Sequence, residues 1–117
     1  MSQLVGNLTL RKPESQNVEF VSKLEQLRQN IDKLDDQIIQ KMAERMQIVE
    51  KIGEYKRDND VTILQVNRWE EIMEKRTSFA KALNLSEPFT HRLLDLIHSE
   101  SIRRQTEIMN TKPVEHA

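Results

Sequence analysis

The chain has 117 residues, of which 32% are charged and only 4% aromatic, with two glycines and three prolines, and this composition is typical of one domain of long helices. The net charge of −1 excludes a general positive field for nucleic acid or an anionic membrane. The chain contains no cysteine and three scattered histidines, which excludes disulfide or thiolate chemistry and predicts no metal site.

Residues 1–18 show no sustained hydrophobic period, and Gly6, Pro13 and Ser15 fall among them, so we expect a tail or linker. The N-terminus lacks the apolar core and cleavage site of a signal peptide. No apolar run approaches the ~20 residues that span a bilayer. A soluble, cytoplasmic protein is the simplest interpretation.

A helical period runs from about Phe20 to Arg57 without a proline. Such a helix is roughly 55 Å long, whereas a 117-residue globule has a radius of gyration of only ~13–14 Å. One chain of this size cannot cover both ends of the apolar stripe. We therefore predict a homodimer, in which a second copy covers the stripe about a two-fold axis.

Two shorter helices are expected after a polar loop at 57–61. The first fits residues 66–83 and ends near Asn84, a residue type that suits a helix C-terminus. The second runs from about Glu87 to Asn110, with Ser86 as N-cap and Pro88 in the first turn. Residues 111–117 are expected to be a flexible end. The predicted fold class is all-α, a three-helix chain with one very long first helix in an intertwined homodimer.

Polar side chains interrupt two of the predicted apolar stripes. On the first helix, the ladder through Met42, Val49 and Ile52 also contains Arg45 and Lys56, eleven residues apart and within ~20° of the same direction. The inner stripe of the third helix contains Ser101 and Gln105, one turn apart.

Two cations beside a hydroxyl and a carboxamide suit a small anion with more than one acidic group. Arginine matches a carboxylate with a planar fork and lysine provides a compact charge. Arg68, at the start of the second helix, is placed to add a third cation at the mouth of this pocket. Arg28 points ~100° away from Arg45 and would serve the pocket of a partner in an antiparallel pair.

Simpler interpretations stay open from spacing alone. Glu44 or Glu50 could neutralise the neighbouring cations, and isolated arginines usually pair with an acid or reach to solvent. A helical dimer without a ligand therefore remains as an alternative to an anion-binding dimer.

The residues that carry this pattern resemble, in order, the all-α class of chorismate mutases. The resemblance covers roughly residues 20–110 and rests on "LR..ID.LD" at 27–35, Arg45, Gly53 with Lys56, Arg68, and Ser101 with Gln105. It implies an intertwined dimer that rearranges chorismate to prephenate within a domain at residues 19–110.

The resemblance also implies roles for the polar residues. Arg28 would reach into the partner's site, and Arg45 and Arg68 would hold the two carboxylates of the dianion. Lys56 and Gln105 would donate hydrogen bonds to the ether oxygen, and Ser101 would support a carboxylate. The rearrangement is pericyclic, so it requires no nucleophile, metal or cofactor, and the protein acts by holding the reactive conformer and stabilising charge on the ether oxygen.

Two positions depart from the family pattern. Where many members carry acids that meet the substrate's ring hydroxyl, this chain has Gln65 and Trp69. Gln65 can still meet that hydroxyl, but Trp69 cannot accept a hydrogen bond. We therefore expect modest turnover by this chain alone.

The segments "LVGNLTLRKPES" and "ILQVNRW" resemble the mutase domain at the C-terminal end of a fused 3-deoxy-heptulosonate-7-phosphate synthase. Residues 1–18 would then be the last element of the synthase and a linker, and the mutase domain would also sense prephenate for the synthase. Two further alternatives are an isochorismate–pyruvate lyase, which shares this fold, and a catalytically weak module that binds the ligand and dimerises.

Overall fold

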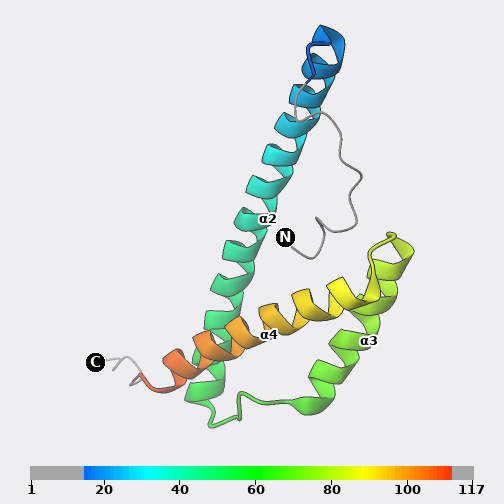
Figure 1. Cartoon of the computed structure of the whole chain (residues 1–117). Helices are drawn as coiled ribbons and strands as arrows, with labels where there is room; N and C mark the ends of the chain where they lie inside the picture. Colours follow the sequence, from blue (N-terminus) through cyan, green and yellow to red (C-terminus); the bar gives the residue numbers. More distant parts are fainter. Residues whose placement is uncertain (1–14, 112–117) are drawn as a thin grey trace. The chain divides into compact units, whose positions relative to one another are not determined.

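The structure, a computed structural model, describes residues 15–111, in which three α-helices follow one another along the chain (Figure 1). They are α2 (Val18–Asp58), α3 (Val66–Ala82) and α4 (Glu87–Met109). The predicted all-α class and the very long first helix are confirmed. Within residues 15–111 no helix is both long enough and apolar enough to cross a membrane. Most of the predicted tail at 1–18 and most of the predicted end at 111–117 lie outside the described residues.

The helix bounds agree with the sequence prediction to within two residues. The largest differences are at α2, which begins at Val18 instead of Phe20. The side chain of Asn17 explains this start, because its Oδ1 accepts a hydrogen bond of 3.1 Å from the backbone N–H of Phe20. Asparagine is a preferred N-cap, since it satisfies one of the unpaired amides of the first turn.

The junction between α3 and α4 has the predicted capping residues. Asn84 has a positive φ of 68°, the left-handed conformation that ends many helices, and its N–H bonds the carbonyl of Lys81. Ser86 caps α4, and its Oγ accepts a 3.3 Å hydrogen bond from the N–H of Phe89. Pro88 lies in the first turn, where a missing N–H leaves no bond broken.

The chain divides into two compact units, Met1–Gln40 and Lys41–Ala117, and α2 continues through the boundary. In the first unit, none of residues 15–40 is buried. Its apolar stripe includes Leu27, Ile31 and Ile38, whose exposed fractions are 60%, 55% and 61%. This stripe has the helical period of a buried surface, yet a single chain leaves it uncovered.

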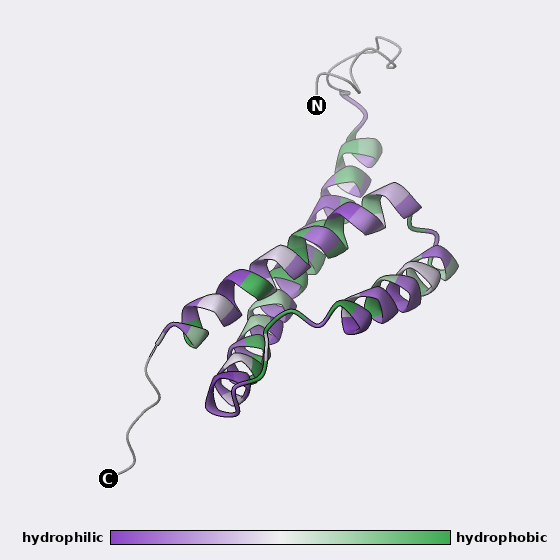
Figure 2. Cartoon of the chain, turned by 90° about the horizontal axis from the view of Figure 1, so that it is seen from below, coloured by the Kyte–Doolittle hydropathy of each residue, from purple (hydrophilic) through white to green (hydrophobic). Residues whose placement is uncertain are grey.

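The second unit contains the last part of α2 together with α3 and α4. Figure 1 shows that α4 begins beside the end of α3 and then crosses the last part of α2. Helix α4 also packs against α3. Polar and apolar residues are interspersed along all three helices (Figure 2). The small buried set combines apolar with polar side chains: Met46, Val49, Gly53, Ala80, Thr90, Ser101 and Gln105.

The buried stripe of α2 differs from the predicted ladder. Val49 is buried as expected, but its buried neighbours are Met46 and Gly53, which each lie one residue beyond the predicted Arg45 and Ile52. Gly53 brings the backbones of α2 and α4 together, because a Cβ there would lie 3.3 Å from the Cα of Gln105. Arg45 and Lys56 therefore lie beside the buried stripe of α2 and are not part of it.

We expect Gly53→Val to destabilise the second unit, by about 1–3 kcal/mol for an overpacked contact. The added side chain meets the backbone of Gln105 and the Cβ of Ile108, both at 3.3 Å, and neither can rotate away. Urea unfolding followed by circular dichroism measures the effect. Ala80→Gly, which removes volume from α3 without crowding the crossing, is a control for general loss of stability. A Gly53→Val protein as stable as the wild type would show that the crossing is looser than described.

Candidate anion-binding site

A cavity of about 250 Å³ lies between the last part of α2, α3 and α4. Six of the seven residues predicted to bind the ligand line it: Arg45, Lys56, Gln65, Arg68, Ser101 and Gln105. The remainder of the wall is mainly apolar, with Val49, Ile52 and Ile72 among the lining residues. The volume is near the lower end of the range for small-molecule sites, which suits a compact metabolite.

Lys56 is held in place by two neutral acceptors. Its Nζ donates to the backbone carbonyl of Ile63 at 3.2 Å and to Oε1 of Gln105 at 3.1 Å. The first bond fixes the α2–α3 connection beside the cavity, and the second joins α2 to α4. Burial lowers the pKa of Lys56 below its ordinary value. The ammonium therefore has a defined position, and no carboxylate of residues 15–111 lies within 4.0 Å of it.

Arg45 makes the second link between α2 and α4. Its Nη1 donates to Oγ of Ser101 at 2.6 Å, while that hydroxyl donates its own proton to the carbonyl of Ile97 at 2.8 Å. Burial and the nearby charge of Arg76 lower the pKa of the Arg45 guanidinium. Its bond to a neutral hydroxyl leaves the positive charge uncompensated.

The acids that were candidates to neutralise these cations are bonded elsewhere. Glu44 pairs with Lys41 at 3.1 Å, and Glu50 pairs with Arg104 at 2.7 Å. Within residues 15–111, no carboxylate lies within 4.0 Å of the charged nitrogens of Arg45 or Lys56. The interpretation that Glu44 or Glu50 neutralises the two cations is therefore wrong for the single chain.

Two arginines of α4, Arg103 and Arg104, are paired with acids, unlike Arg45 and Lys56 of the cavity. Glu100 accepts hydrogen bonds from Arg103 and Arg104, and these two bonds lower its pKa to about 2. Arg103 also bonds Glu107, and Arg104 reaches across to α2. Arg103 and Arg104 thus have counter-ions, whereas Arg45 and Lys56 have none within 4.0 Å among residues 15–111.

Arg68 and Gln65 lie at the start of α3, at the edge of the cavity. Arg68 is 65% exposed at its side chain and has only a loose ion pair, 4.0 Å long, with Glu71. Gln65 occupies the N-cap position, but its side chain makes no capping hydrogen bond. Both side chains are therefore available to a ligand.

Arg28, the seventh predicted residue, is an exposed residue of α2 in the first unit. It is not among the residues that line the cavity, all of which belong to the second unit. Its predicted role in the site of a partner subunit stays a prediction.

The sequence analysis did not identify His98, although it lines the same cavity. Its imidazole stacks on Trp69, with ring centroids 3.8 Å apart and planes inclined by 18°. From the sequence, the histidines are assessed only as metal ligands. The available signal was the spacing, because 98, 101 and 105 follow a 3–4 helical ladder with the two predicted polar residues.

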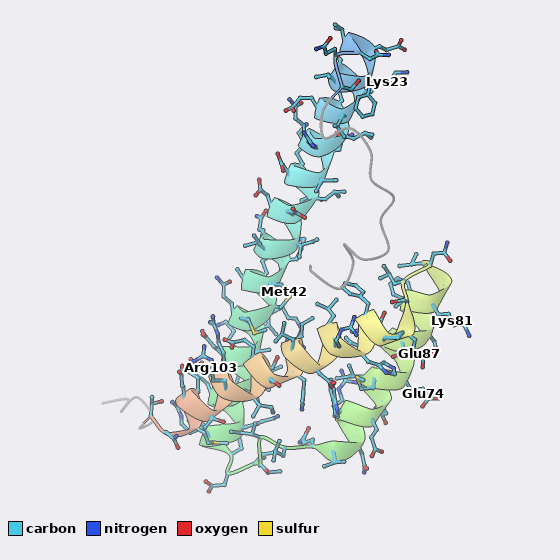
Figure 3. All side chains as sticks on the ribbon, in the orientation of Figure 1. Lys23, Met42, Glu74, Lys81, Glu87 and Arg103 are labelled. Atoms are coloured by element: carbon cyan, nitrogen blue, oxygen red, sulfur yellow. The ribbon has the colours of Figure 1, made fainter. Side chains whose placement is uncertain are left out.

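A second cavity, between α3 and α4, has the opposite charge. Its volume is about 480 Å³, and carboxylates of Glu70, Glu74 and Glu87 line it. Figure 3 labels Glu74 on α3 and Glu87 on α4. Within residues 15–111, no three His, Cys, Asp or Glu side chains are placed to hold a metal ion. The carboxylates make this cavity unsuited to an anion, in contrast to the first cavity.

Cations that have no carboxylate within 4.0 Å among residues 15–111, together with fixed neutral donors, are suited to a small, multiply charged anion. The profile of the family described as chorismate mutase type II matches residues 27–106, and the chain belongs to this family. The predicted resemblance to the all-α mutases is confirmed.

Two curated relatives extend this comparison. The bifunctional chorismate mutase/prephenate dehydratase of Buchnera aphidicola subsp. Schizaphis graminum (strain Sg) is 34% identical over 83 residues, which are 71% of this chain and 22% of that protein. The protein of the same description from Buchnera aphidicola subsp. Acyrthosiphon pisum (strain APS) is 29% identical over 82 residues, covering 70% of this chain and 21% of the relative. The chain thus spans about a fifth of the length of the curated relatives that it matches.

Proposed function

We propose that this chain binds chorismate in the cavity of the second unit and rearranges it to prephenate. The observation that carries the proposal is the pair of fixed cations, Arg45 and Lys56, that lack a carboxylate partner within residues 15–111. Lys56 is half-buried, where an unpaired charge is costly, and a bound dianion would offset that cost while also pairing with the more exposed Arg45. Membership of the chorismate mutase type II family supports the choice of dianion.

The hydrogen bonds suggest which part of the substrate each site residue would bind. Arg45, supported by Ser101, and Arg68 would bind the two carboxylates. Lys56 would donate to the ether oxygen. Because Oε1 of Gln105 already accepts from Lys56, the NH₂ group of that carboxamide remains to donate to the same oxygen. Gln65 would contact the ring at the open edge of the cavity.

This donor set suits a pericyclic rearrangement. One C–O bond breaks while one C–C bond forms, and no proton is transferred, so the protein needs no general base. The cations would hold the flexible dianion in its compact, reactive conformer. The ether oxygen gains negative charge as the C–O bond breaks, so donors aimed at it stabilise the transition state more than the ground state.

We further propose that the active form is a homodimer. The uncovered stripe of residues 15–40, with Leu34 56% and Ile38 61% exposed, supports a second copy as its occupant. In an antiparallel pair of α2 helices, the exposed Arg28 would complete the cation set in the partner's cavity. The proposed dimer would thus bury the stripe and would add Arg28, the seventh predicted residue, to each cavity.

The parent context is a separate proposal. The sequence of residues 63–69 and of the leading segment resembles a mutase domain fused to a 3-deoxy-heptulosonate-7-phosphate synthase, in which bound prephenate would regulate the synthase. The two matched relatives instead name prephenate dehydratase beside chorismate mutase. Residues 1–14, which carry most of the resemblance to the synthase, lie outside the described residues. The synthase origin and the sensing role therefore stay predictions.

Product analysis distinguishes the mutase from the alternatives. The purified chain is incubated separately with chorismate and with isochorismate, and the products are separated by chromatography. We expect prephenate from chorismate and no salicylate or pyruvate from isochorismate. Salicylate with pyruvate would identify a lyase. Tight calorimetric binding of prephenate without turnover would instead identify a ligand-binding module.

A further inference from the structure

His98 is the polar group of the cavity that the proposed mechanism leaves unused. It lies on α4 one turn before Ser101 and is half-buried. Stacking on Trp69 of α3 covers one face of the imidazole and restricts its rotation. Its ring nitrogens make no hydrogen bond with any group of residues 15–111, and neither is a buried, unpaired atom. Both nitrogens are therefore accessible.

The cavity is rich in donors and poor in free acceptors. The arginines and the lysine only donate. The hydroxyl of Ser101 and Oε1 of Gln105 already accept from Arg45 and Lys56, and the carbonyl of Ile63 is also used by Lys56. Among the described lining side chains, the acceptors that make no hydrogen bond at all belong to Gln65, which is exposed at the edge, and to His98, which is fixed by its stack.

The environment favours the neutral form of this imidazole. Burial lowers the pKa of His98, the charge of Arg45 on α2 lowers it further, and Asp95 on α4 opposes both. A neutral imidazole always carries one donor and one acceptor nitrogen. His98 thus offers an acceptor in a cavity whose cations supply only donors.

The hydrogen-bonding groups of the chorismate dianion are complementary to those of the cavity. Its carboxylates and ether oxygen only accept hydrogen bonds, and its ring hydroxyl is its single donor. We propose that His98 is a substrate-binding residue that accepts the hydrogen bond of this ring hydroxyl, with Trp69 as the residue that positions the imidazole. This inference rests on the proposed function. It assigns a role to Trp69 that a carboxylate at that position could not have, because the indole ring stacks on the imidazole.

The test measures kcat/KM for chorismate and for its ring O-methyl ether, which lacks the hydroxyl proton. His98→Phe keeps an aromatic ring for the stack but removes the acceptor. We expect this variant to lower kcat/KM for chorismate roughly five- to tenfold, the effect of one neutral hydrogen bond, and to leave the value for the ether unchanged. His98→Gln, which keeps an acceptor, should recover part of the loss for chorismate only.

His91→Phe is the matched control, because His91 lies on the same helix and does not line this cavity; its Nε2 is 3.7 Å from a carboxylate oxygen of Glu87. It should leave both values unchanged. Equal losses for chorismate and the ether in His98→Phe, or no loss for either, would overturn the role of His98 while leaving the proposed function intact. If the wild-type chain neither turned over chorismate nor bound prephenate, both the role of His98 and the proposed function would be overturned.

Discussion

Lys56→Ala is expected to lower kcat for chorismate by about 100- to 1,000-fold, which corresponds to the loss of one preorganised donor to a developing oxyanion. Two acceptors, the Ile63 carbonyl and Gln105, hold the ammonium in place before substrate arrives, so no reorganisation is needed during the reaction. The measurement is steady-state kinetics on the purified variant.

Stability measurements separate this catalytic effect from misfolding. The folded protein loses two half-buried hydrogen bonds in Lys56→Ala, about 2 kcal/mol of stability in total, whereas the expected change in the barrier is about 2.7–4 kcal/mol. Urea unfolding measures the first quantity, and kinetics at equal folded concentration measures the second. Lys51→Ala is the matched control, since Lys51 is exposed on the same helix and points about 140° away. Near-normal turnover of Lys56→Ala would show that Lys56 does not stabilise the transition state.

The pH profile gives independent evidence on the same side chain. Burial lowers the pKa of Lys56 from its ordinary 10.5. The required ammonium is present below that pKa, so kcat/KM should fall as the pH rises, with a midpoint below 10.5. A bound dianion favours the charged form, so the fall in kcat should occur at higher pH than the fall in kcat/KM. The profile of Lys56→Ala should lack this alkaline fall.

Mixing two inactive variants should restore activity if Arg28 completes the cavity of a partner subunit. Arg28→Ala and Lys56→Ala are expected to be nearly inactive alone, because removal of a buried charge partner typically costs about 2–5 kcal/mol. After joint unfolding and refolding, half of the dimers carry one copy of each variant. One of their two sites then has both residues, so about a quarter of wild-type activity should return.

The matched control combines Arg45→Ala with Lys56→Ala. Both residues line the same cavity of one chain, so every site of a mixed dimer lacks one of them. No activity should return in this mixture. Recovery in the control, or none in the first mixture, would contradict a site shared between subunits.

Much of the fold followed from the sequence because its signals are local. The period of α2, the cap at Ser86 and the helix end at Asn84 are properties of neighbouring residues, and the structure confirms them. The cap at Asn17 was available by the same reasoning but was treated as part of a linker. The buried stripe at Met46 and Gly53 was missed, because the choice between adjacent stripes depends on where α4 crosses.

The site shows the same division between local and distant information. Spacing placed Arg45, Lys56, Ser101 and Gln105 around one cavity because each pair shares a helix face. It did not reveal that Glu50 bonds Arg104, because that pair joins residues 54 positions apart on different helices. The stack of His98 on Trp69 likewise joins two helices and required the structure.

The most direct test of the central claim follows the loss of chorismate absorbance after addition of the purified chain, with Arg45→Ala measured in parallel. The claim is that the uncompensated cations of one cavity bind and convert this dianion. It predicts loss of absorbance clearly faster than the uncatalysed reaction with the wild-type chain and much slower loss with Arg45→Ala, at equal folded concentration judged by circular dichroism. Equal rates for the two proteins, or no loss beyond the uncatalysed reaction for either, would contradict it.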